Sequence, residues 1–491
     1  MKQKISDKSM ERPNVLLLIM DTARLDVVQS GIRAGQFPSL RRIADEGVLF
    51  EKAISNAPWT LPSHSSIFSG EQPSSHLTYI KNKEFSPSGR PLAKVLQDSG
   101  YETVGYSNNF WITPELGFDD GFDEFYLPWT LSPRGYNLTE ILDGGSVRDK
   151  FRTLFEKLDS NAPFTLGNLL YGIYLSQTSR YDDGAKRTTK ILKQKIQNSG
   201  SAPFFIFANY MEPHLPYHPP DEYYTEELQK YEESEVLSVN QDPWEYVAEA
   251  VQMDDQDFDI LRELYRSEIR YLDAKIGEVL DTLENESSLD ETMVIIAGDH
   301  GEHIGENEFM DHQYSLSEYL IQVPLLVRYP ERFPENETVS SLVELRDIYP
   351  TILNASVGKK WQSQEPDSVS RKGLSTALEA GREYAVSEYL EPQPQIEDLR
   401  ARVSDVQTDM SRFDRALRSI RTPESKFIES SDDDEWFFEF SGGRKPLEDE
   451  SARQELRSLM ENLPPLVRSP DTADADLSES TEDRLSDLGY I

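Results

Sequence analysis

The stretch Met293-Val-Ile-Ile-Ala-Gly-Asp-His-Gly-Glu302 decides the fold that this chain is expected to adopt. Its first five residues are apolar and mostly β-branched, which is typical of a strand buried on both faces of a parallel sheet. The run stops at Gly298, and two potential metal ligands, Asp299 and His300, follow directly. Ligand-binding side chains collect at the carboxyl ends of such strands, because the chain leaves the apolar core there for a crevice. The alternative is a polar turn that only closes the strand.

Similar apolar runs predict further strands of the same sheet. One run, residues 15–19, ends at Met20-Asp21-Thr22. The other extended runs cover residues 48–53, 102–106, 203–209 and 323–329. Helices are predicted between them at residues 38–47, 92–99, 185–196, 258–283 and 347–354, with a further short helix that closes at Gly70. Strands that alternate with helices predict an α/β fold with a doubly wound, mostly parallel central sheet flanked by helices.

The rest of the sequence divides into smaller parts. Residues 127–181, with a helix near 147–158, and residues 221–255 interrupt the pattern and are expected to shape the pocket. Residues 357–370 are polar and linker-like. Strands at 383–390, 416–421, 426–430 and 436–440 and a helix at 451–461 predict a smaller C-terminal α+β subdomain. The predicted divisions are a disordered segment 1–11, a main α/β domain 12–370, a subdomain 371–468 and an acidic tail 469–491.

Composition limits the partners and the environment of the chain. Asp and Glu outnumber Lys and Arg 88 to 50, which gives a formal net charge of −38. A field of that sign repels nucleic acid and anionic lipid surfaces, so neither is expected as a partner. Because the acidic residues are spread along the whole chain, one hypothesis is a halophilic source, in which excess carboxylates keep a protein soluble in concentrated salt.

Cysteine is absent, so the chain forms no disulfide, thiolate metal site or cysteine nucleophile. Residues 1–12 are charged and lack the apolar region of a signal peptide, and no apolar run has the length of a membrane span. The expectation is therefore a cytoplasmic protein with no integral membrane segment. The sequence leaves the oligomeric state open.

A candidate nucleophile lies in residues 57–70, Ala-Pro-Trp-Thr-Leu-Pro-Ser-His-Ser-Ser-Ile-Phe-Ser-Gly. Thr60 stands at the start of a predicted helix, whose N-terminal end is positively polarised. A free threonine hydroxyl is a poor nucleophile and needs a metal or a base to become an alkoxide. Asp21, Asp299 and His300 could bind such a metal. An ordinary helix N-cap is the alternative for Thr60.

Together these segments resemble the sulfatase branch of the alkaline phosphatase superfamily, over most of the chain. Residues 12–24 resemble the family's opening strand with its metal-binding aspartate, and residues 57–70 resemble the signature that carries the nucleophile, with Thr60 in that position. Residues 210–217, Tyr-Met-Glu-Pro-His-Leu-Pro-Tyr, are similar to the segment with an active-site histidine. Residues 298–306 resemble the second metal-ligand segment. The segments occur in the family's order.

The resemblance implies a metal site in which Asp21, Asp299 and His300 are ligands and Thr60 contributes its oxygen. Oxygen ligands with a single imidazole suit one divalent ion, Ca²⁺, Mn²⁺, Mg²⁺ or Zn²⁺, and the sequence does not choose among them. His214 matches the family's histidine on the leaving-group or substrate oxygen. A surface histidine in a proline-rich loop is the alternative for that residue.

Further site residues are assigned by position in the same segments. His312 falls near the family's second cationic group, although Asp311 could take that position instead. His64 is predicted to bind substrate, and Asn108 to donate a hydrogen bond to a substrate oxyanion. A turn-forming asparagine is the alternative for Asn108. His303 is expected to point outward as a spacer.

The chain departs from the family's pattern at three positions. Sulfatases convert a Cys or Ser of the signature to formylglycine, but Thr60 carries an extra methyl on Cβ and cannot give that aldehyde, so no formylglycine is expected. His64 replaces the family's usual Arg, and Asp21-Thr22 replaces a common pair of aspartates. These differences resemble the superfamily's threonine-dependent phosphotransfer enzymes, which include phosphodiesterases and phosphoglycerol or phosphoethanolamine transferases.

The main hypothesis is metal-dependent hydrolysis of a phosphate or sulfate ester by in-line attack of Thr60, with His214 or His312 protonating the leaving oxygen. The expected substrate is a small-molecule or glycan ester. One alternative is a phosphoglycerol- or phosphoethanolamine-type transferase that acts on a glycan or polyol acceptor. The other is a non-catalytic binding protein, against which the retained candidate metal ligands count.

The acidic composition generates a prediction about salt. We expect the chain to stay folded and active in molar KCl, because counterions screen the repulsion among its carboxylates. Thermal melting followed by circular dichroism across a KCl series measures this, with a protein of near-zero net charge as the control. Unfolding or inactivation by molar salt would contradict a halophilic source.

Overall fold

The computed structural model describes residues 12–128, 184–403, 406, 408–440, 445–446 and 448–466. The predicted segment 1–11, the tail 469–491, the helix near 147–158 and most of the 127–181 excursion lie outside these ranges. Within them, no helix combines the length and the apolar character needed to cross a bilayer.

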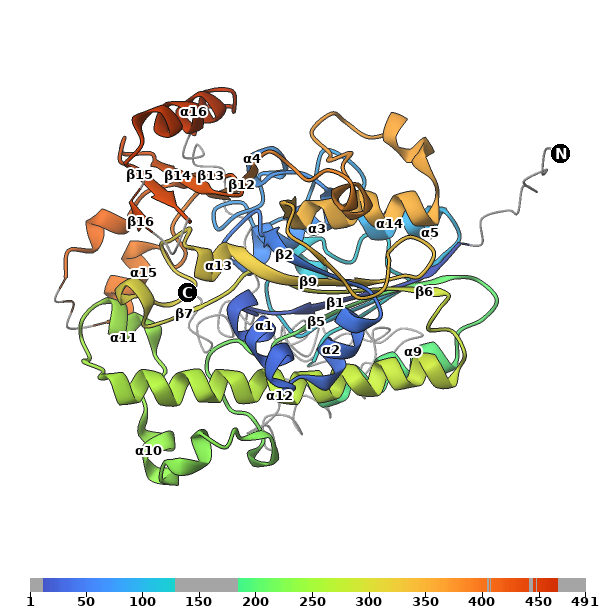
Figure 1. Cartoon of the computed structure of the whole chain (residues 1–491), viewed down its shortest axis with the longest axis horizontal. Coiled ribbons are helices and arrows are strands. Elements are labelled where there is room, and N and C mark those ends of the chain that lie inside the picture. The colour runs from blue at the N-terminus through green and yellow to red at the C-terminus, as the bar shows by residue number, and fades with distance from the viewer. Residues whose placement is uncertain are drawn as a thin grey trace, which may run out of the picture.

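A nine-stranded sheet forms the centre of the molecule, in the order β10-β2-β9-β6-β1-β5-β3-β4 with β11 paired to β2 (Figure 1). Strand β1 (Asn14–Met20) pairs in parallel with β5 (Phe204–Tyr210) and β6 (Thr292–Gly298). Only β9 (Gln322–Arg328) runs antiparallel to its neighbours, β6 and β2 (Val48–Ile54). The outer strands are β3 (Glu102–Ser107), β4 (Glu124–Tyr126), β10 (Glu337–Val339) and β11 (Val343–Glu344). The predicted mostly parallel sheet is confirmed.

Helices cover both faces of this sheet (Figure 1). Because side chains alternate along a strand, Val15 and Leu17 of β1 join one apolar cluster while Leu16 and Leu18 join the other. One face is covered by α1 (Leu25–Ala34), α2 (Pro38–Asp45), α9 (Ala185–Gln197) and α12 (Asp255–Asn285). The other is covered by α3 (Thr60–Ser69), α5 (Leu92–Asp98) and α14 (Ile348–Ser356). The doubly wound architecture predicted from the alternation is therefore present.

The long helix α12 begins earlier than its apolar periodicity indicates. The predicted start at Phe258 is the first large apolar residue, whereas the helix starts at Asp255. Asp254 accepts hydrogen bonds from the backbone of the first turn, and Asp257 accepts one from the backbone N–H of Asp254. This capping box satisfies N–H groups that have no partner within the helix, so it sets the boundary.

The acidic excursion 221–255 is divided between two places. Helix α10 (Glu233–Ser238) lies on the outer side of α12, away from the sheet (Figure 1). Helix α11 (Pro243–Val247) contacts β8 (Met310–Asp311). The second half of this segment therefore reaches the strand that carries Asp311.

The segment 357–370 is packed rather than linker-like. Trp361 is buried and packs edge-to-face on Tyr349 of α14, with ring centroids 5.5 Å apart. Val369 is buried in the same apolar cluster. The polar composition of the segment suggested a linker, but the side chains of Trp361 and Val369, together with Val357, attach it to the main domain.

A five-stranded antiparallel sheet forms most of the C-terminal part, coloured orange to red in Figure 1. Helix α16 (Glu450–Glu461) packs on it through Leu456 and Met460. Its strands are β12 (Ala385–Tyr389), β13 (Leu417–Arg421), β14 (Ser425–Ser430), β15 (Glu435–Glu439) and β16 (Lys445–Pro446). The predicted smaller α+β subdomain is confirmed.

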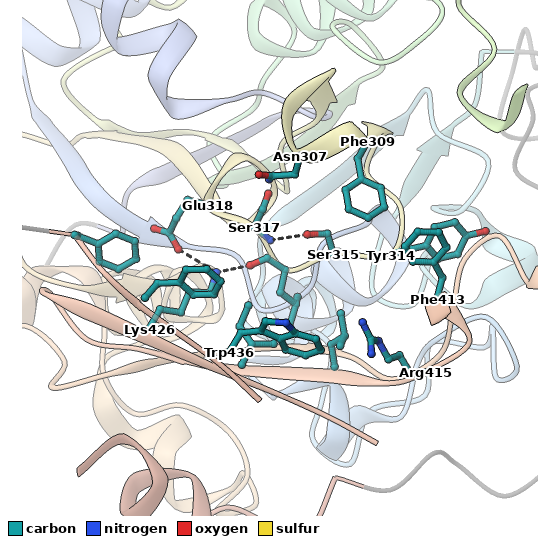
Figure 2. Close-up of a pocket in the computed structure, with 15 residues that line it drawn as sticks. Asn307, Phe309, Tyr314, Ser315, Ser317, Glu318, Phe413, Arg415, Lys426 and Trp436 are labelled. Carbon is teal, nitrogen blue, oxygen red and sulfur yellow. Dashed lines mark hydrogen bonds and ion pairs between the residues drawn. The ribbon is translucent and has the colours of Figure 1, made fainter. Parts of the chain in front are cut away.

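A buried ion pair joins this sheet to the segment that follows the candidate site. Lys426 Nζ lies 3.1 Å from Glu318 Oε1, and Arg421 Nε lies 3.2 Å from Glu318 Oε2. Figure 2 shows Lys426 and Glu318 at one side of a hollow of about 420 Å³ between the two parts. Aromatic side chains line that hollow, among them Phe309, Tyr314, Phe413 and Trp436.

Removing this carboxylate is predicted to destabilise the protein. Glu318→Gln leaves Lys426 and Arg421 buried without their counter-charge, a change that costs about 3 kcal/mol or more. The matched control is Glu227→Gln, which removes an exposed partner of Lys230 and should change the stability little, because solvent screens the pair. Melting temperatures measure both. Equal effects of the two substitutions would contradict the structural role of Glu318.

Candidate active site

Two neighbouring strands bring three candidate ligands together. Asp21 follows β1, Asp299 and His300 follow β6, and Met20 is level with Gly298 across the parallel pair. All three side chains are fully buried, and each offers an atom within 4.8 Å of the others. The predicted meeting of these strand ends is therefore present.

Thr60 completes this group from the start of α3. Trp59 is the N-cap residue and Thr60 is the first residue of the helix, so Thr60 does not serve as the N-cap. Its Oγ1 lies 3.3 Å from His300 Nε2 and accepts a hydrogen bond from Asn109 Nδ2 at 3.3 Å. The hydroxyl thus faces the candidate ligands.

In each of the two carboxylates, one oxygen accepts hydrogen bonds from described residues and the other accepts none. Asp21 Oδ2 accepts hydrogen bonds from Asn109 Nδ2 at 2.8 Å and Asn209 Nδ2 at 3.0 Å. Asp299 Oδ1 accepts from the backbone N–H of Thr22 at 3.2 Å. Asp21 Oδ1 and Asp299 Oδ2 have no hydrogen-bond partner among the described residues. Buried polar atoms are normally paired, so these two oxygens are candidate ligand atoms for a cation.

The His300 ring is oriented toward the same point. Its Nδ1 donates to the backbone oxygen of Gly301 at 2.9 Å, so the lone pair of Nε2 faces Thr60 Oγ1 and the two carboxylates. Nε2 lies 3.4 Å from Asp299 Oδ2 and 3.7 Å from Asp21 Oδ1. A neutral imidazole held by its other nitrogen is the usual arrangement of a metal-binding histidine.

Electrostatics in the absence of an ion disfavour charge on these groups. Burial and the charge of Asp21 raise the pKa of Asp299 well above its usual range. Burial and the neighbouring His312 lower the pKa of His300 well below its usual value. A divalent cation beside Asp299 would reverse the penalty on its carboxylate. The donor set, with its unpaired oxygens, therefore fits a cation.

Backbone geometry aims Asp21 and Asp299 at each other. Thr22 adopts a left-handed conformation with φ of 56°, which is strained for a β-branched residue. Tyr265 of α12 holds this turn, because its hydroxyl donates to Thr22 O at 2.8 Å and accepts from Arg24 N at 2.7 Å. A Cβ at Gly301 would lie 2.0 Å from the backbone oxygen of Tyr319, so only glycine permits this approach.

The predicted leaving-group residues form a second buried group beside the first. His214, Asp311 and His312 lie together, and the ring centroids of His300 and His312 are 4.7 Å apart. Both Asp311 and His312 belong to this group, and the choice between them for the family's second cationic position stays a prediction. Burial lowers the pKa of His214. Burial raises the pKa of Asp311, but the contact with His312 lowers it by more, so the pKa of Asp311 lies below its usual value.

The predicted role of Asn108 is wrong by one residue. Asn108 Nδ2 donates to Thr188 Oγ1 at 2.9 Å and to the backbone oxygen of Asn209 at 3.1 Å, so it fixes the scaffold. Asn109 takes the position in the site, on Asp21 and Thr60. Both asparagines follow β3, and the turn between them decides which amide faces the site.

His64 contacts the candidate ligands from within the protein. Its Nδ1 donates to the backbone oxygen of Thr60 at 3.0 Å and lies 3.4 Å from Asp299 Oδ2. Burial lowers the pKa of His64 to about 4. These contacts support the position of Asp299, and substrate binding by His64 stays a prediction.

The prediction that His303 points outward is wrong, and the buried Glu302 was not predicted. His303 does not point outward: it is fully buried, its Nε2 contacts Ser317 Oγ at 2.6 Å, and its ring stacks on Phe309. Glu302 is also fully buried and accepts a hydrogen bond from the Tyr217 hydroxyl. Burial and the charge of Asp311 raise the pKa of Glu302 well above its usual range. Its place directly after the candidate ligands was the only signal in the sequence.

Comparisons with known proteins agree with this fold. The sulfatase family model matches residues 13–358. An arylsulfatase from Clostridium perfringens is 23% identical over 397 residues, a match that covers 75% of this chain and 79% of that protein. A solved phosphonate monoester hydrolase from Silicibacter pomeroyi superposes with a TM-score of 0.63 at 19% identity and covers 92% of this chain and 94% of its own.

A second solved structure holds a glycan substrate. The neighbour in that structure was solved in complex with its substrate D-glucosamine-2-N,6-O-disulfate. Its fold superposes on this chain with a TM-score of 0.61 at 17% sequence identity, and the match covers 92% of this chain and 97% of the neighbour's chain. At such identities the structures establish the fold, whereas the family match spans more than half of the chain. The chain therefore belongs to the sulfatase family and is an ester hydrolase.

Proposed function

We propose that this sulfatase-family hydrolase cleaves phosphate or sulfate esters with the Thr60 hydroxyl as its nucleophile. The observation that carries the proposal is the position of Thr60 Oγ1, which lies 3.3 Å from His300 Nε2 at the edge of the Asp21–Asp299 pair. Thr60 is also the first residue of a ten-residue helix, and the backbone N–H groups at the N-terminal end of that helix attract an anionic ester.

The donor set supports one divalent cation, held by Asp21, Asp299, His300 and Thr60. Asp21 Oδ1 and Asp299 Oδ2 are unpaired among the described residues, and His300 Nε2 faces both. Oxygen ligands with a single imidazole suit Ca²⁺, Mn²⁺, Mg²⁺ or Zn²⁺. When bound, such an ion lowers the pKa of a coordinated hydroxyl and neutralises charge on the ester oxygens.

Thr60, His214 and His312 carry out the bond-making and proton-transfer steps of this proposed ester cleavage. With a phosphate ester, solvent water takes the proton of Thr60 Oγ1 as this oxygen forms a bond to phosphorus. The ester oxygen leaves from the opposite side, and His214 or His312 gives that oxygen a proton. Water then cleaves the phosphothreonine and restores Thr60. Asn109 bridges Asp21 Oδ2 and Thr60 Oγ1, so it orients the nucleophile relative to the carboxylate.

Phosphate esters are the favoured substrate class within this proposal. The methyl group on Cβ of Thr60 rules out conversion to an aldehyde, so attack by an aldehyde hydrate is closed to this chain. The substrate screen includes aryl phosphate monoesters and diesters, phosphonates, sulfates and glycan esters with each candidate metal. The two solved relatives, which act on a phosphonate monoester and on a sulfated glucosamine, motivate the last three classes.

The screen also separates hydrolysis from group transfer. A hydrolase releases product at a rate that does not depend on an added polyol. A phosphoglycerol- or phosphoethanolamine-type transferase forms product in proportion to a polyol or glycan acceptor. Product analysis with and without glycerol distinguishes the two reactions.

Thr60→Ala is predicted to lower kcat by about 10³-fold or more, because it removes the atom that forms the covalent bond. Thr60→Ser keeps the hydroxyl and should retain much more activity. The control is Ser66→Ala on the same helix, whose hydroxyl bonds to His76 and which should change kcat little. Undiminished turnover by Thr60→Ala, measured on the best substrate of the screen, would refute the proposed nucleophile.

Removal of metal is predicted to destabilise the protein. A cation present at about 100 times its Kd contributes about 2.7 kcal/mol, and chelation leaves two buried carboxylates facing each other. Wild-type protein should therefore melt at a lower temperature in EDTA, and added metal should reverse the shift.

Two variants make this experiment specific to the site. Asp299→Asn should lose most of the EDTA shift, because it removes a ligand and one of the two facing charges. Asp273→Asn should keep the shift, because the Asp273 carboxylate is buried on the backbone N–H groups of Ser39 and Leu40 instead. An EDTA shift that is absent in the wild type, or unchanged in Asp299→Asn, would contradict the metal site.

A further inference from the structure

Two buried serine hydroxyls meet at one backbone oxygen beside the candidate ligands. Ser63 Oγ donates to the backbone oxygen of Asp299 at 2.7 Å, and Ser55 Oγ donates to the same oxygen at 2.5 Å. The two hydroxyl oxygens lie 3.1 Å apart, and Ser55, Ser63 and Asp299 are all fully buried. The shared acceptor belongs to the peptide bond that joins Asp299 to His300. Both hydroxyls therefore hold the peptide between two candidate ligands.

The two serines come from different elements of the fold. Ser55 directly follows β2, and its backbone N–H donates to the backbone oxygen of Ile321 at 2.7 Å. Ser63 belongs to α3 and follows Thr60 by three residues, a spacing that places both on one face of the helix. The Asp299 oxygen thus ties β2 and α3 to the end of β6.

The C-terminal sheet holds Ser55 from its other side. Ser387 of β12 is fully buried, and its hydroxyl donates to the backbone oxygen of Ser55 at 2.5 Å. The backbone N–H of Glu388 donates to the backbone oxygen of Asn56 at 2.9 Å. The position of the Ser55 hydroxyl is therefore fixed by contacts on its own backbone.

The bond from Ser63 fixes how the start of α3 lies relative to His300. Thr60 is on the helix that Ser63 anchors, and His300 is on the peptide that receives the bond. Thr60 Oγ1 lies 3.3 Å from His300 Nε2, so a shift of the helix changes this distance directly. A misplacement of about 1 Å lowers the rate of an orientation-dependent reaction by about 10²-fold.

Each serine is able to compensate in part for the loss of the other. A carbonyl oxygen has two lone pairs and accepts both hydroxyls. Ser55 Oγ also lies 2.7 Å from the backbone oxygen of Ala57, so its single proton has two acceptors. Without the Ser63 hydroxyl, Ser55 still has a proton for the Asp299 oxygen. Residues that share one acceptor in this way have coupled effects, not independent ones.

We infer that Ser55 and Ser63 are positioning residues. Their hydroxyls together hold the Asp299–His300 peptide against α3 and so place Thr60 for attack. The inference rests on the proposed function, in which Thr60 is the nucleophile, and adds the residues that set its distance from His300. Both serines act through the backbone oxygen of Asp299 and not on the ester.

The competing interpretation is that the two hydroxyls only satisfy a buried oxygen and stabilise the fold. Both interpretations predict lower melting temperatures when the hydroxyls are removed, so stability does not separate them. They differ in the kcat of the folded enzyme and in the way that kcat depends on Thr60.

The test is a double-mutant cycle in kcat, measured with the full chain on the best substrate of the screen. Ser55→Ala and Ser63→Ala should each lower kcat by less than about 10-fold, because one donor remains. The double variant should lower kcat by about 10²-fold with KM almost unchanged, since the nucleophile is displaced while the ester still binds. The double effect should therefore exceed the product of the single effects.

The matched control is Ser65→Ala on the same helix. Ser65 is also fully buried, and its hydroxyl donates to the backbone oxygen of Leu61 within α3 at 2.8 Å. This substitution should change kcat little, and its effect should multiply with that of Ser55→Ala, because the two hydroxyls share no acceptor.

A second readout separates positioning from stability. In the Thr60→Ala background, the two serine substitutions should cause no further loss of rate, since no hydroxyl remains to be placed. A purely structural role would lower the residual rate again by the same factor. Circular dichroism checks the fold of each variant. Ser55→Cys combined with Ser63→Cys replaces a double alanine variant that does not fold, because a thiol is a weak donor.

A folded double variant with the kcat of the wild type would overturn the inference. Single effects that multiply to the double effect, or an equal further loss in the Thr60→Ala background, would overturn it as well. Failure of the proposed function gives a different result, because Thr60→Ala would then turn over at the rate of the wild type. Inactive Thr60→Ala protein alongside a fully active double serine variant would refute the positioning role alone.

Discussion

The rest of the structure depends on two buried carboxylates that face each other, Asp21 and Asp299. Each is fully buried and presents one oxygen without a hydrogen-bond partner among the described residues. Two such groups in a dry interior repel each other and favour unfolding unless a positive charge joins them. The fold keeps them together because both follow strands paired along their whole length, β1 and β6. A rigid sheet thus holds two carboxylates in an arrangement that is suited to a cation.

The neighbouring parts of the molecule fix the residues around this pair. Tyr265 of the long helix holds the strained turn at Thr22, and Asn109 from the end of β3 joins Asp21 to Thr60. The C-terminal sheet acts from further away, through the buried contacts of Glu318 with Lys426 and Arg421. Since Glu318 follows His312 by a few residues, the small sheet anchors the segment that carries Asp311 and His312.

The sequence predicted the strands well, because buried parallel strands are continuous apolar runs and their periodicity is local. Errors arose where polar contacts set the outcome. The start of α12 depends on a capping box at Asp254, which lies before the apolar periodicity begins. The choice of Asn109 over Asn108 depends on the conformation of one turn. His303 was expected at the surface, but the fold covers it with Ser317 and Phe309.

The sequence by itself determined the α/β class, the mostly parallel sheet and the first candidate ligands. The strands are visible as local apolar runs, and the candidate ligands Asp21, Asp299 and His300 follow the ends of two of these runs. Only the tertiary structure decided which atoms meet. Thr60 and His300 lie 240 residues apart and come within 3.3 Å through strand register and helix packing. The grouping of His214 with Asp311 and His312 was decided in the same way, since a pairwise distance depends on every intervening turn and no local period of the sequence encodes it.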